Sequence, residues 1–439
     1  MDTIAGFPLL GLEITKDGQV FKPEQAVAIQ QAVRDVGAAR LTDLIVISHG
    51  WNNDMAEARQ LYQELLGNIA SLMPNHGSLA QRKFAVVGVF WPSKEFADSE
   101  LIPAGGAASL GEDGADLSSS ALKQKIESLK GTFDFPDEQP LDRAKALVDG
   151  IEDSVAKQEE FVKIIRSLVP GKPADITDDA SDRFFKDAPR EILAVLAGPS
   201  IALPADNAGG VSLDMDDVGG AASLGDFFSG VKAAAWRLLN YATYYQMKER
   251  AGVVGKALNG VLAPVRSLRP DLAIHLIGHS FGARVVAAAA DGASALRPSS
   301  LSLLQGAFSH NGFTEKFDGS NDGFFRKVVA QSKIAGPIIA THTVNDKAVG
   351  IAYPLASRLA SDNAKALGDE NDQYGGIGRN GAVRMKSAEC VQGTLLPATG
   401  AYQFLAGKVY NLKADAFITG HGDVKGPQVA NAIIFAFGA

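Results

Sequence analysis

The pentapeptide Gly278-His279-Ser280-Phe281-Gly282 has the G-x-S-x-G spacing that presents a serine as a nucleophile. It follows the apolar run Leu272–Ile277, which predicts a strand, and it precedes a run rich in alanine and valine, which favours a helix. In a strand–turn–helix of this kind, side chains flanking the serine would collide with nearby backbone, so glycines stand there. The N-terminus of the helix would direct backbone N–H groups at negative charge developing beside Ser280. We therefore predict that Ser280 is a nucleophile at a nucleophile elbow.

A serine hydroxyl is a weak nucleophile at neutral pH, so it needs a base, and the base needs an orienting carboxylate. The expected chain order is serine, then aspartate or glutamate, then histidine. We predict His421 as the base, because it lies in a glycine-flanked loop between the last strand-like run and the closing helix. His310 also follows Ser280 and remains an alternative that could line the pocket. His342 falls inside a predicted strand, and we expect it to be structural.

The acid should directly follow a strand between the serine and the histidine. Asp346 does so, and we predict it as the acid, with a helix-capping role as the alternative. Asp318 and Asp322 lie in a Gly/Asn-rich loop with no clear strand before it, which is typical of turn-forming residues. Asp423 is too near His421 in the chain for the usual arrangement.

A second glycine-containing turn, Ser48-His49-Gly50-Trp51, follows the first clear strand. A glycine there allows close approach of the backbone to the nucleophile. We predict that the backbone N–H groups of Trp51 and Phe281 form the oxyanion hole. The side chains of His49 and His279, which belong to the two turns, are predicted to contact the substrate.

The elements that must position these residues are read from hydrophobic periodicity. Four short apolar runs predict strands that are buried on both faces: residues 41–48, 84–90, 272–277 and 338–344. Between the first two, apolar residues recur every three or four positions over 55–72, which indicates an amphipathic helix. Strand, helix and strand in this order form a βαβ unit. We predict an α/β fold with a mostly parallel central sheet flanked by helices.

The stretch from Lys94 to Val231 differs in character from the rest. It begins and ends with Gly-rich segments and has helical periodicity from Leu141 to Leu168. Long irregular loops are uncommon inside a compact domain. We therefore predict three regions: residues 1–93 as the first part of the core, 94–231 as a large helical insertion with flexible junctions, and 232–439 as the second part. The insertion could be a cap over the pocket or a peripheral addition.

Composition and motif context argue against several classes of partner and cofactor. A net charge of −8 over 439 residues argues against a nucleic-acid partner, and the single cysteine cannot form an internal disulfide. Residues 376–381 match G-x-G-x-x-G, but their lead-in is polar rather than a strand, so we predict a loop and no dinucleotide cofactor. No apolar stretch reaches 18 residues and no secretory signal precedes the core, so we expect no membrane span and a cytoplasmic protein.

Five segments together resemble the α/β-hydrolase superfamily, in particular its bacterial serine-esterase-like and lipase-like members: VISHGWNND, VFWPS, LIGHSFGARV, THTVNDKAVG and TGHGDV. The resemblance covers residues 1–93 and about 232–439. It implies hydrolysis of an ester or related acyl bond with no metal and no organic cofactor. It also places the predicted triad and oxyanion residues at the family's positions: Ser280, Asp346, His421, Trp51 and Phe281. The large insertion and the 75 residues (421 − 346) between acid and base depart from the pattern.

We accordingly expect a serine hydrolase that cleaves a carboxylic ester through an acyl-enzyme. The expected partner is a small-molecule or lipid ester. A lipid ester is included because a helical insertion could act as a lid. Thioesterase, amidase or acyltransferase activity is an alternative with the same triad. A catalytically silent binding or effector module that retains the fold is the alternative from another class.

Overall fold

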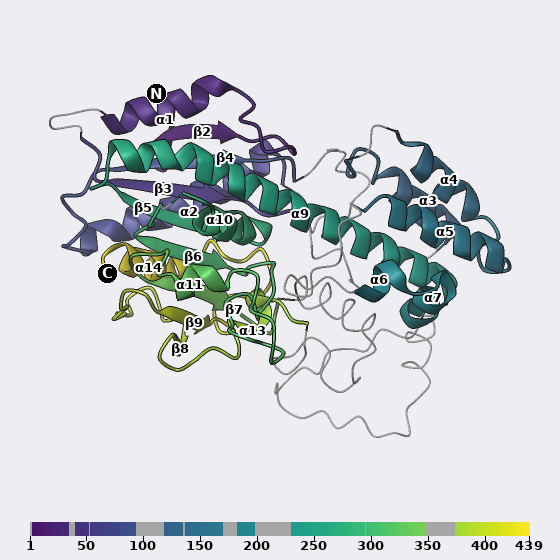
Figure 1. The fold of residues 1–439 in the computed structure, drawn as a ribbon. Helices are drawn as coiled ribbons and strands as arrows, with labels where there is room; N and C mark the ends of the chain where they lie inside the picture. The colour runs from purple at the N-terminus through teal and green to yellow at the C-terminus, as the bar shows by residue number, and fades with distance from the viewer. Residues whose placement is uncertain are drawn as a thin grey trace.

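The computed structural model describes residues 2–34, 40–51, 53–93, 118–134, 137–169, 182–197, 230–294, 296–346, 349 and 374–439. The strands described form one nine-stranded sheet in the order β1-β2-β4-β3-β5-β6-β7-β9-β8 (Figure 1). β1 pairs with β2 in antiparallel fashion, and every other neighbouring pair is parallel. The strands have these bounds: β1 Thr3–Ile4, β2 Phe7–Glu13, β3 Asp43–Ser48, β4 Phe84–Phe90, β5 Ala273–His279, β6 Ser300–Leu304, β7 Ile338–His342, β8 Cys390–Thr394 and β9 Val409–Lys413. The α/β class with a mostly parallel sheet is confirmed.

The central strands are covered by helices on both faces, which explains their continuous apolar sequences. Every residue of β3, β4 and β6 is buried. One face packs against α1 (Pro23–Arg34), α10 (Phe281–Asp291) and the C-terminal half of α9 (Val231–Leu268), as Figure 1 shows. The other face packs against α2 (Met55–Leu72) and α14 (Pro427–Phe437). α2 is the amphipathic helix that the periodicity of residues 55–72 predicts.

A separate group of helices lies beyond one end of the sheet (Figure 1). Its members are α3 Ser119–Glu127, α4 Gln139–Leu147, α5 Val155–Ser167, α6 Asp182–Lys186 and α7 Pro189–Ala197. They bury a core of their own against the N-terminal half of α9. Because α9 ends at Leu268, just before the amino end of β5, its other end projects past the carboxyl ends of the strands. This helical cluster therefore lies on the side of the sheet at which Ser280 follows β5.

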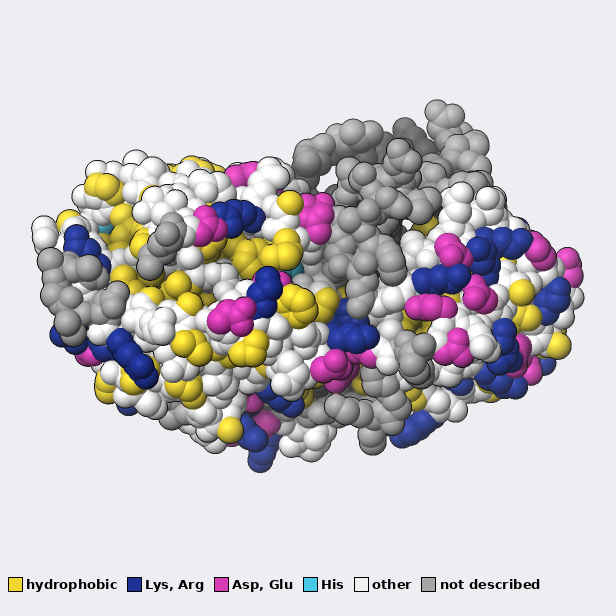
Figure 2. All heavy atoms as spheres, turned by 90° about the horizontal axis from the view of Figure 1, so that it is seen from above, with side chains coloured by type: hydrophobic (Ala, Val, Ile, Leu, Met, Phe, Trp, Pro, Cys, Tyr) yellow, Lys and Arg dark blue, Asp and Glu magenta, His cyan; other side chains and the backbone are white. Residues whose placement is uncertain are grey.

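One helix belongs to both cores. α9 is a single helix of 38 residues that begins at Val231, next to the boundary predicted at residue 232, and the change from one core to the other falls inside it. Most of its buried apolar residues up to Tyr245 pack into the helical cluster, whereas Tyr244 and the buried apolar residues from Met247 onward pack against the sheet. In Figure 2 positive and negative side chains are intermingled over the helical cluster, and hydrophobic ones gather on the sheet region. The Gly-rich ends predicted for the insertion lie outside the described residues.

Buried polar contacts fix the helical cluster to the core. The guanidinium of Arg250, in α9, donates to the carbonyl oxygen of Pro92 at 2.7 Å, next to the end of β4. It also donates to the carbonyl oxygen of Thr132 at 2.8 Å and to Oδ1 of Asp134 at 2.7 Å. The amide of Gln246 donates to the other oxygen of Asp134 at 2.6 Å. Since Arg250 is buried, its bonds to both regions define how the cluster sits on the core.

Several elements have no clear signal in the sequence. β1, β2 and α1 precede the first predicted strand, and β8 matches none of the predicted strands. β8 is an edge strand with four exposed side chains out of five, so no apolar run marks it. The periodicity predicted over residues 141–168 is divided between α4 and α5. The remaining short helices are η1 Met73–Asn75, α11 Arg326–Ala330 and α13 Ile377–Asn380.

Candidate active site

The turn between β5 and α10 holds Ser280 in a left-handed backbone conformation, with φ of +56°. A side chain at Gly278 would collide with the backbone of Gly282, and a side chain at Gly282 would collide with the carbonyl groups of Ser48 and His49. Both glycines are therefore required by close approach of backbone, the reason for which the sequence predicts them. The turn places Ser280 at the carboxyl edge of the sheet, beside the loop after β3.

Three predicted residues meet at this edge. The hydroxyl of Ser280 lies 2.8 Å from Nε2 of His421, and Nδ1 of His421 lies 2.8 Å from Oδ2 of Asp346. An ionised carboxylate can only accept, so Nδ1 carries the proton and Nε2 accepts the serine O–H. Ser280 and Asp346 are 3% and 0% exposed, which keeps water from competing for these bonds. The long chain segment between acid and base does not prevent the contact.

The carboxylate of Asp346 is held by further donors. The backbone N–H of Val349 donates to Oδ1 at 2.9 Å, and Nε2 of Gln305 donates to Oδ2 at 3.3 Å. The bond from Val349 and the bond to His421 thus use different oxygens of one carboxylate. The alternative of a helix cap at Asp346 falls on residues that lie largely outside the described part of the chain.

The other two histidines that follow the nucleophile face elsewhere. His310 is buried, and its Nδ1 accepts a hydrogen bond from the amide of Asn380 at 3.0 Å. His342 is the last residue of β7, with Nδ1 3.4 Å from the carbonyl oxygen of Arg379. Burial lowers the pKa of His342. The hydroxyl of Ser280 faces His421, so the geometry favours His421 over His310 as the base.

Every polar atom of the ring and the backbone of His49 makes a hydrogen bond within the protein. Its backbone N–H donates to the hydroxyl of Tyr62 at 2.8 Å, and its carbonyl oxygen accepts the indole N–H of Trp91 at 3.0 Å. Its ring donates through Nδ1 to the carbonyl oxygen of Gly50 at 2.9 Å and accepts the backbone N–H of Trp91 at Nε2, at 3.3 Å. Burial lowers its pKa to about 4, so the ring is neutral. The hydrogen bonds of His49 fix this loop, and its predicted contact with the substrate stays a prediction.

The two predicted oxyanion donors lie at the same edge. Phe281 is the first residue of α10, where a backbone N–H has no partner within the helix. The rings of Trp51 and Phe281 pack edge to face, with centroids 6.3 Å apart. Within the described part of the chain, neither backbone N–H donates to another group. Their assignment as oxyanion donors remains a prediction.

His279 contacts the loop that carries the base. Its Nε2 donates to the carbonyl oxygen of His421 at 2.9 Å, and the two rings have centroids 5.0 Å apart. Burial first, and then the neighbouring His421, lower the pKa of His279 to about 3, so it stays neutral. In this structure His279 supports the backbone of His421, and its predicted contact with the substrate stays a prediction.

Two amides that the sequence analysis did not single out complete the arrangement. The side chain of Asn345 donates to the carbonyl oxygens of Ile418 at 2.9 Å and Asp415 at 3.2 Å, and so joins the acid loop to the base loop. Gln305 follows β6 and reaches Asp346. Asn345 is adjacent to the predicted acid, which is its only signal in the sequence, and nothing in the sequence marks Gln305.

A pocket of about 450 Å³ opens at the carboxyl ends of β2, β3 and β4. Most of its exposed wall is apolar, and Glu13, Lys16 and Asp54 also line it. The apolar part comes from Ile14, Phe21, Met55, Phe90, Trp91 and Pro92. His49 also lines it, and the next residue, Gly50, lies against Ser280. The pocket therefore adjoins the loop beside the nucleophile.

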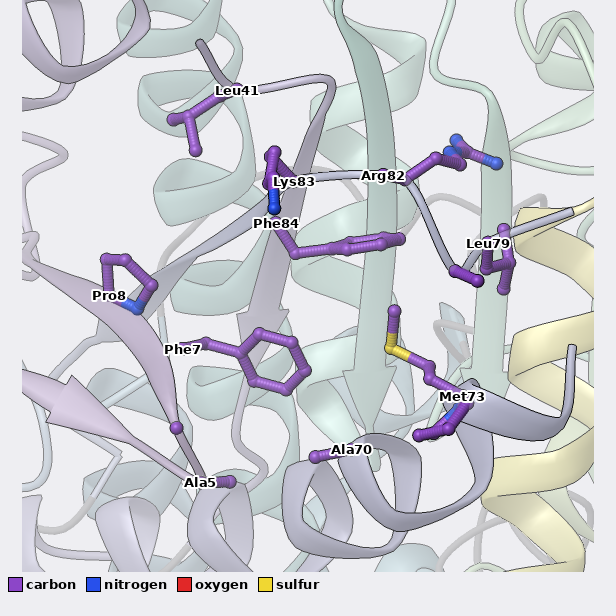
Figure 3. Close-up of a pocket in the computed structure, with 13 residues that line it drawn as sticks. Ala5, Phe7, Pro8, Leu41, Ala70, Met73, Leu79, Arg82, Lys83 and Phe84 are labelled. Atoms are coloured by element: carbon purple, nitrogen blue, oxygen red, sulfur yellow. The ribbon is translucent and has the colours of Figure 1, made fainter. Parts of the chain in front are cut away.

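A second pocket, of about 570 Å³, lies at the amino ends of β2 and β4, on the opposite edge (Figure 3). Figure 3 shows Phe7, Phe84 and Met73 converging on it, and the guanidinium of Arg82 lies over the ring of Phe84. Arg82 also pairs with Asp43, a member of the network described next. This pocket is remote from Ser280.

Near the same edge is a second Ser-His-Asp set. His275 lies 2.8 Å from the hydroxyl of Ser300 and 2.9 Å from Oδ1 of Asp43. All three residues are 0% exposed, so no substrate reaches them in this structure. The network satisfies buried polar groups where β3, β5 and β6 begin.

Among the described residues, no cluster of three histidine, cysteine or acidic side chains is arranged as metal ligands. None of the described helices combines the length and apolarity needed to cross a membrane. No protein-family model matches the chain, and neither the curated proteins nor the solved structures include a significant match.

Proposed function

We propose that this protein is a serine hydrolase of the α/β-hydrolase type that cleaves carboxylic esters through an acyl-enzyme. The observation that carries the proposal is the continuous hydrogen-bonded chain from Ser280 through His421 to Asp346, with both bonds at 2.8 Å. A nucleophile, a base and an orienting acid within hydrogen-bonding distance form the arrangement that activates a serine.

In the first half of the reaction, Oγ of Ser280 attacks the acyl carbon while Nε2 of His421 takes the hydroxyl proton. The carbonyl π-electrons move to the oxygen, and the oxyanion forms beside the N-terminus of α10, whose dipole favours negative charge. The protonated His421 then gives its proton to the departing alkoxide as the carbonyl re-forms. The products of this half are an alcohol and Ser280 in ester linkage with the acyl group.

In the second half, His421 removes a proton from a water molecule, and the resulting hydroxide oxygen attacks the acyl carbon. The bond to Oγ breaks, and His421 returns the proton to Ser280. Asp346 stays ionised throughout and stabilises the imidazolium that forms twice in each cycle. The buried hydrogen bonds of Asp346 keep the imidazole in the tautomer that the reaction needs.

The apolar pocket at the carboxyl edge supports an ester with a hydrocarbon portion, including a lipid ester. Its volume of about 450 Å³ lies in the range typical of small-molecule sites. Its wall is mostly hydrophobic, which favours an acyl or alkyl chain over a charged group. The position of the helical cluster on this side of the sheet is compatible with a cap.

The proposal is tested with a fluorophosphonate probe and p-nitrophenyl esters of increasing chain length. We expect labelling and turnover by the natural protein, and loss of both in Ser280→Ala with an unchanged thermal unfolding midpoint. The matched control is Ser300→Ala, which removes the serine of the buried network and should retain labelling. Turnover by Ser280→Ala at the natural rate would disprove the proposal.

The same experiment separates the alternatives. A protein that is labelled but inactive on esters would favour a thioesterase, an amidase or an acyltransferase, since all three use the same residues. A correctly folded protein that the probe never labels would favour a silent binding module.

A further inference from the structure

The turn after β6 resembles the nucleophile turn in one respect: each contains a buried non-glycine residue with positive φ. Gln305 has φ of +44°, and Ser280 has φ of +56°. Of the described non-glycine residues with positive φ, only these two are buried. The turns are neighbours, because the N–H of Ser280 donates to the carbonyl oxygen of Leu304 at 3.0 Å. A strained backbone of this kind persists only where the surrounding structure fixes it, often at functional sites.

The strained turn directs the amide of Gln305 at the acid. Its Nε2 donates to Oδ2 of Asp346 at 3.3 Å and to the carbonyl oxygen of Gly378 at 2.8 Å. The oxygen it reaches is the same one that accepts the Nδ1–H of His421. Gln305 is 0% exposed, so water cannot take the place of its amide.

The Gly376–Gly381 segment, which resembles a dinucleotide fingerprint, holds Gln305 from the other side. A side chain at Gly378 would come within 2.5 Å of the carbonyl carbon of Gln305. The N–H of Gly378 donates to the carbonyl oxygen of Gly306 at 3.0 Å, and its own carbonyl oxygen accepts the N–H of Thr343 at 3.0 Å. The segment thus links the turn after β6 to the loop after β7, and Gly378 is glycine because backbone lies against it.

We propose that Gln305 is a positioning residue that fixes the rotamer of the Asp346 carboxylate toward His421, with Gly376–Gly381 holding Gln305 in place. Without its amide, the carboxylate would keep the bond from Val349 to Oδ1 and could rotate about its Cβ–Cγ bond. The kinetic consequence rests on the proposed hydrolase function, whereas the effect on the hydrogen bond between His421 and Asp346 does not.

The test measures that hydrogen bond directly. The Nδ1 proton of His421 is observed by NMR in ¹⁵N-histidine-labelled protein, for the natural chain and for Gln305→Leu, which keeps the approximate volume without the donor. We expect the low-field signal to weaken or shift, and kcat on an ester to fall roughly 10- to 100-fold with little change in KM. The matched control is Gln246→Leu, which removes another buried glutamine amide that donates to an aspartate. Its His421 signal should match that of the natural protein.

Gln305→Asn keeps the test decisive if the leucine variant does not fold. Asparagine tolerates left-handed backbone well, yet its amide is one methylene short of Asp346. We expect this variant to fold and to show the same weakened signal and lower kcat. An unchanged proton signal and kcat in a folded variant would overturn the proposal, and so would failure of Gln305→Asn to fold, which would assign Gln305 to stability alone. If the natural protein shows no hydrolysis, the proposed function fails while the NMR comparison still decides the role of Gln305.

Discussion

Gly50 lies directly against Ser280: a Cβ built on Gly50 would be 2.5 Å from the Cβ of Ser280 and 3.1 Å from its Oγ. The loop after β3 and the turn after β5 therefore interlock through two glycines, since Gly282 lies in the same way against the backbone of Ser48 and His49. The neighbouring strands β3 and β5 bring the two turns together. The position of the nucleophile thus depends on a residue more than two hundred positions earlier in the chain.

Gly50→Ala should displace Ser280 and lower both stability and activity. The added methyl group overpacks a site bounded by backbone, which typically costs about 1–3 kcal/mol of unfolding free energy. We expect at least a roughly 10-fold loss of kcat on an ester, because even a small misplacement of a reacting atom lowers the reaction rate strongly. The control is Gly67→Ala in α2, where a Cβ meets nothing within 4 Å. It should gain about 0.5–1 kcal/mol of stability and retain activity. A fully active Gly50→Ala protein would contradict this account of the turn.

Removing the base or misorienting it should nearly abolish turnover. We expect His421→Ala and Asp346→Asn to lower kcat by about 10⁴-fold, because the imidazole is then absent or in the wrong tautomer. His342→Ala and His310→Ala should have far smaller effects on kcat, since the hydroxyl of Ser280 faces neither ring. Steady-state kinetics on one ester compares kcat among the four variants. An inactive His310→Ala beside an active His421→Ala would transfer the role of base to His310.

Burial of neutral His49 should make the fold sensitive to mild acid. Its pKa is lowered from 6.5 to about 4, so the unfolded chain binds a proton in this interval and the folded chain does not. The stability that this group contributes is complete above pH 6.5 and falls as the pH drops toward 4, by up to about 3 kcal/mol. Denaturant unfolding across this range measures the slope. His49→Gln, which cannot titrate, should show a shallower slope, and equal slopes would refute the assignment.

The apolar pocket should set the preference for ester chain length, if the proposed function holds. Phe21 is 61% exposed at its wall, and Phe21→Ser should raise KM for long-chain esters roughly 5- to 10-fold while sparing short ones. Leu405→Ser is the control, because Leu405 is 62% exposed and is not part of the pocket wall. Equal effects of the two substitutions on chain-length preference would exclude this pocket as the site of the hydrocarbon portion.

The sequence by itself determined the features that depend on local order. Hydrophobic periodicity located β3, β4, β5, β7 and α2, because a strand covered on both faces must be apolar throughout and a surface helix must be apolar on one side. The spacing of Gly278, Ser280 and Gly282 between a strand and a helix predicted the nucleophile turn, since that backbone admits few residue types. The edge strand β8 has mostly exposed side chains, so burial does not restrict its residue types and no comparable pattern marks it in the sequence.

Only the tertiary structure decided which distant residues meet. His421 and His310 both follow Ser280 in the chain, although only His421 also follows Asp346. The arrangement of β5, β7 and β9 brings His421 rather than His310 to the serine hydroxyl. Hydrogen-bond partners cannot be read from a residue's type, so only the structure shows that the rings of His49 and His279 bond to the protein's own carbonyl groups. Gln305 acquires its place beside Asp346 solely because parallel strands far apart in the chain end at one edge of the sheet.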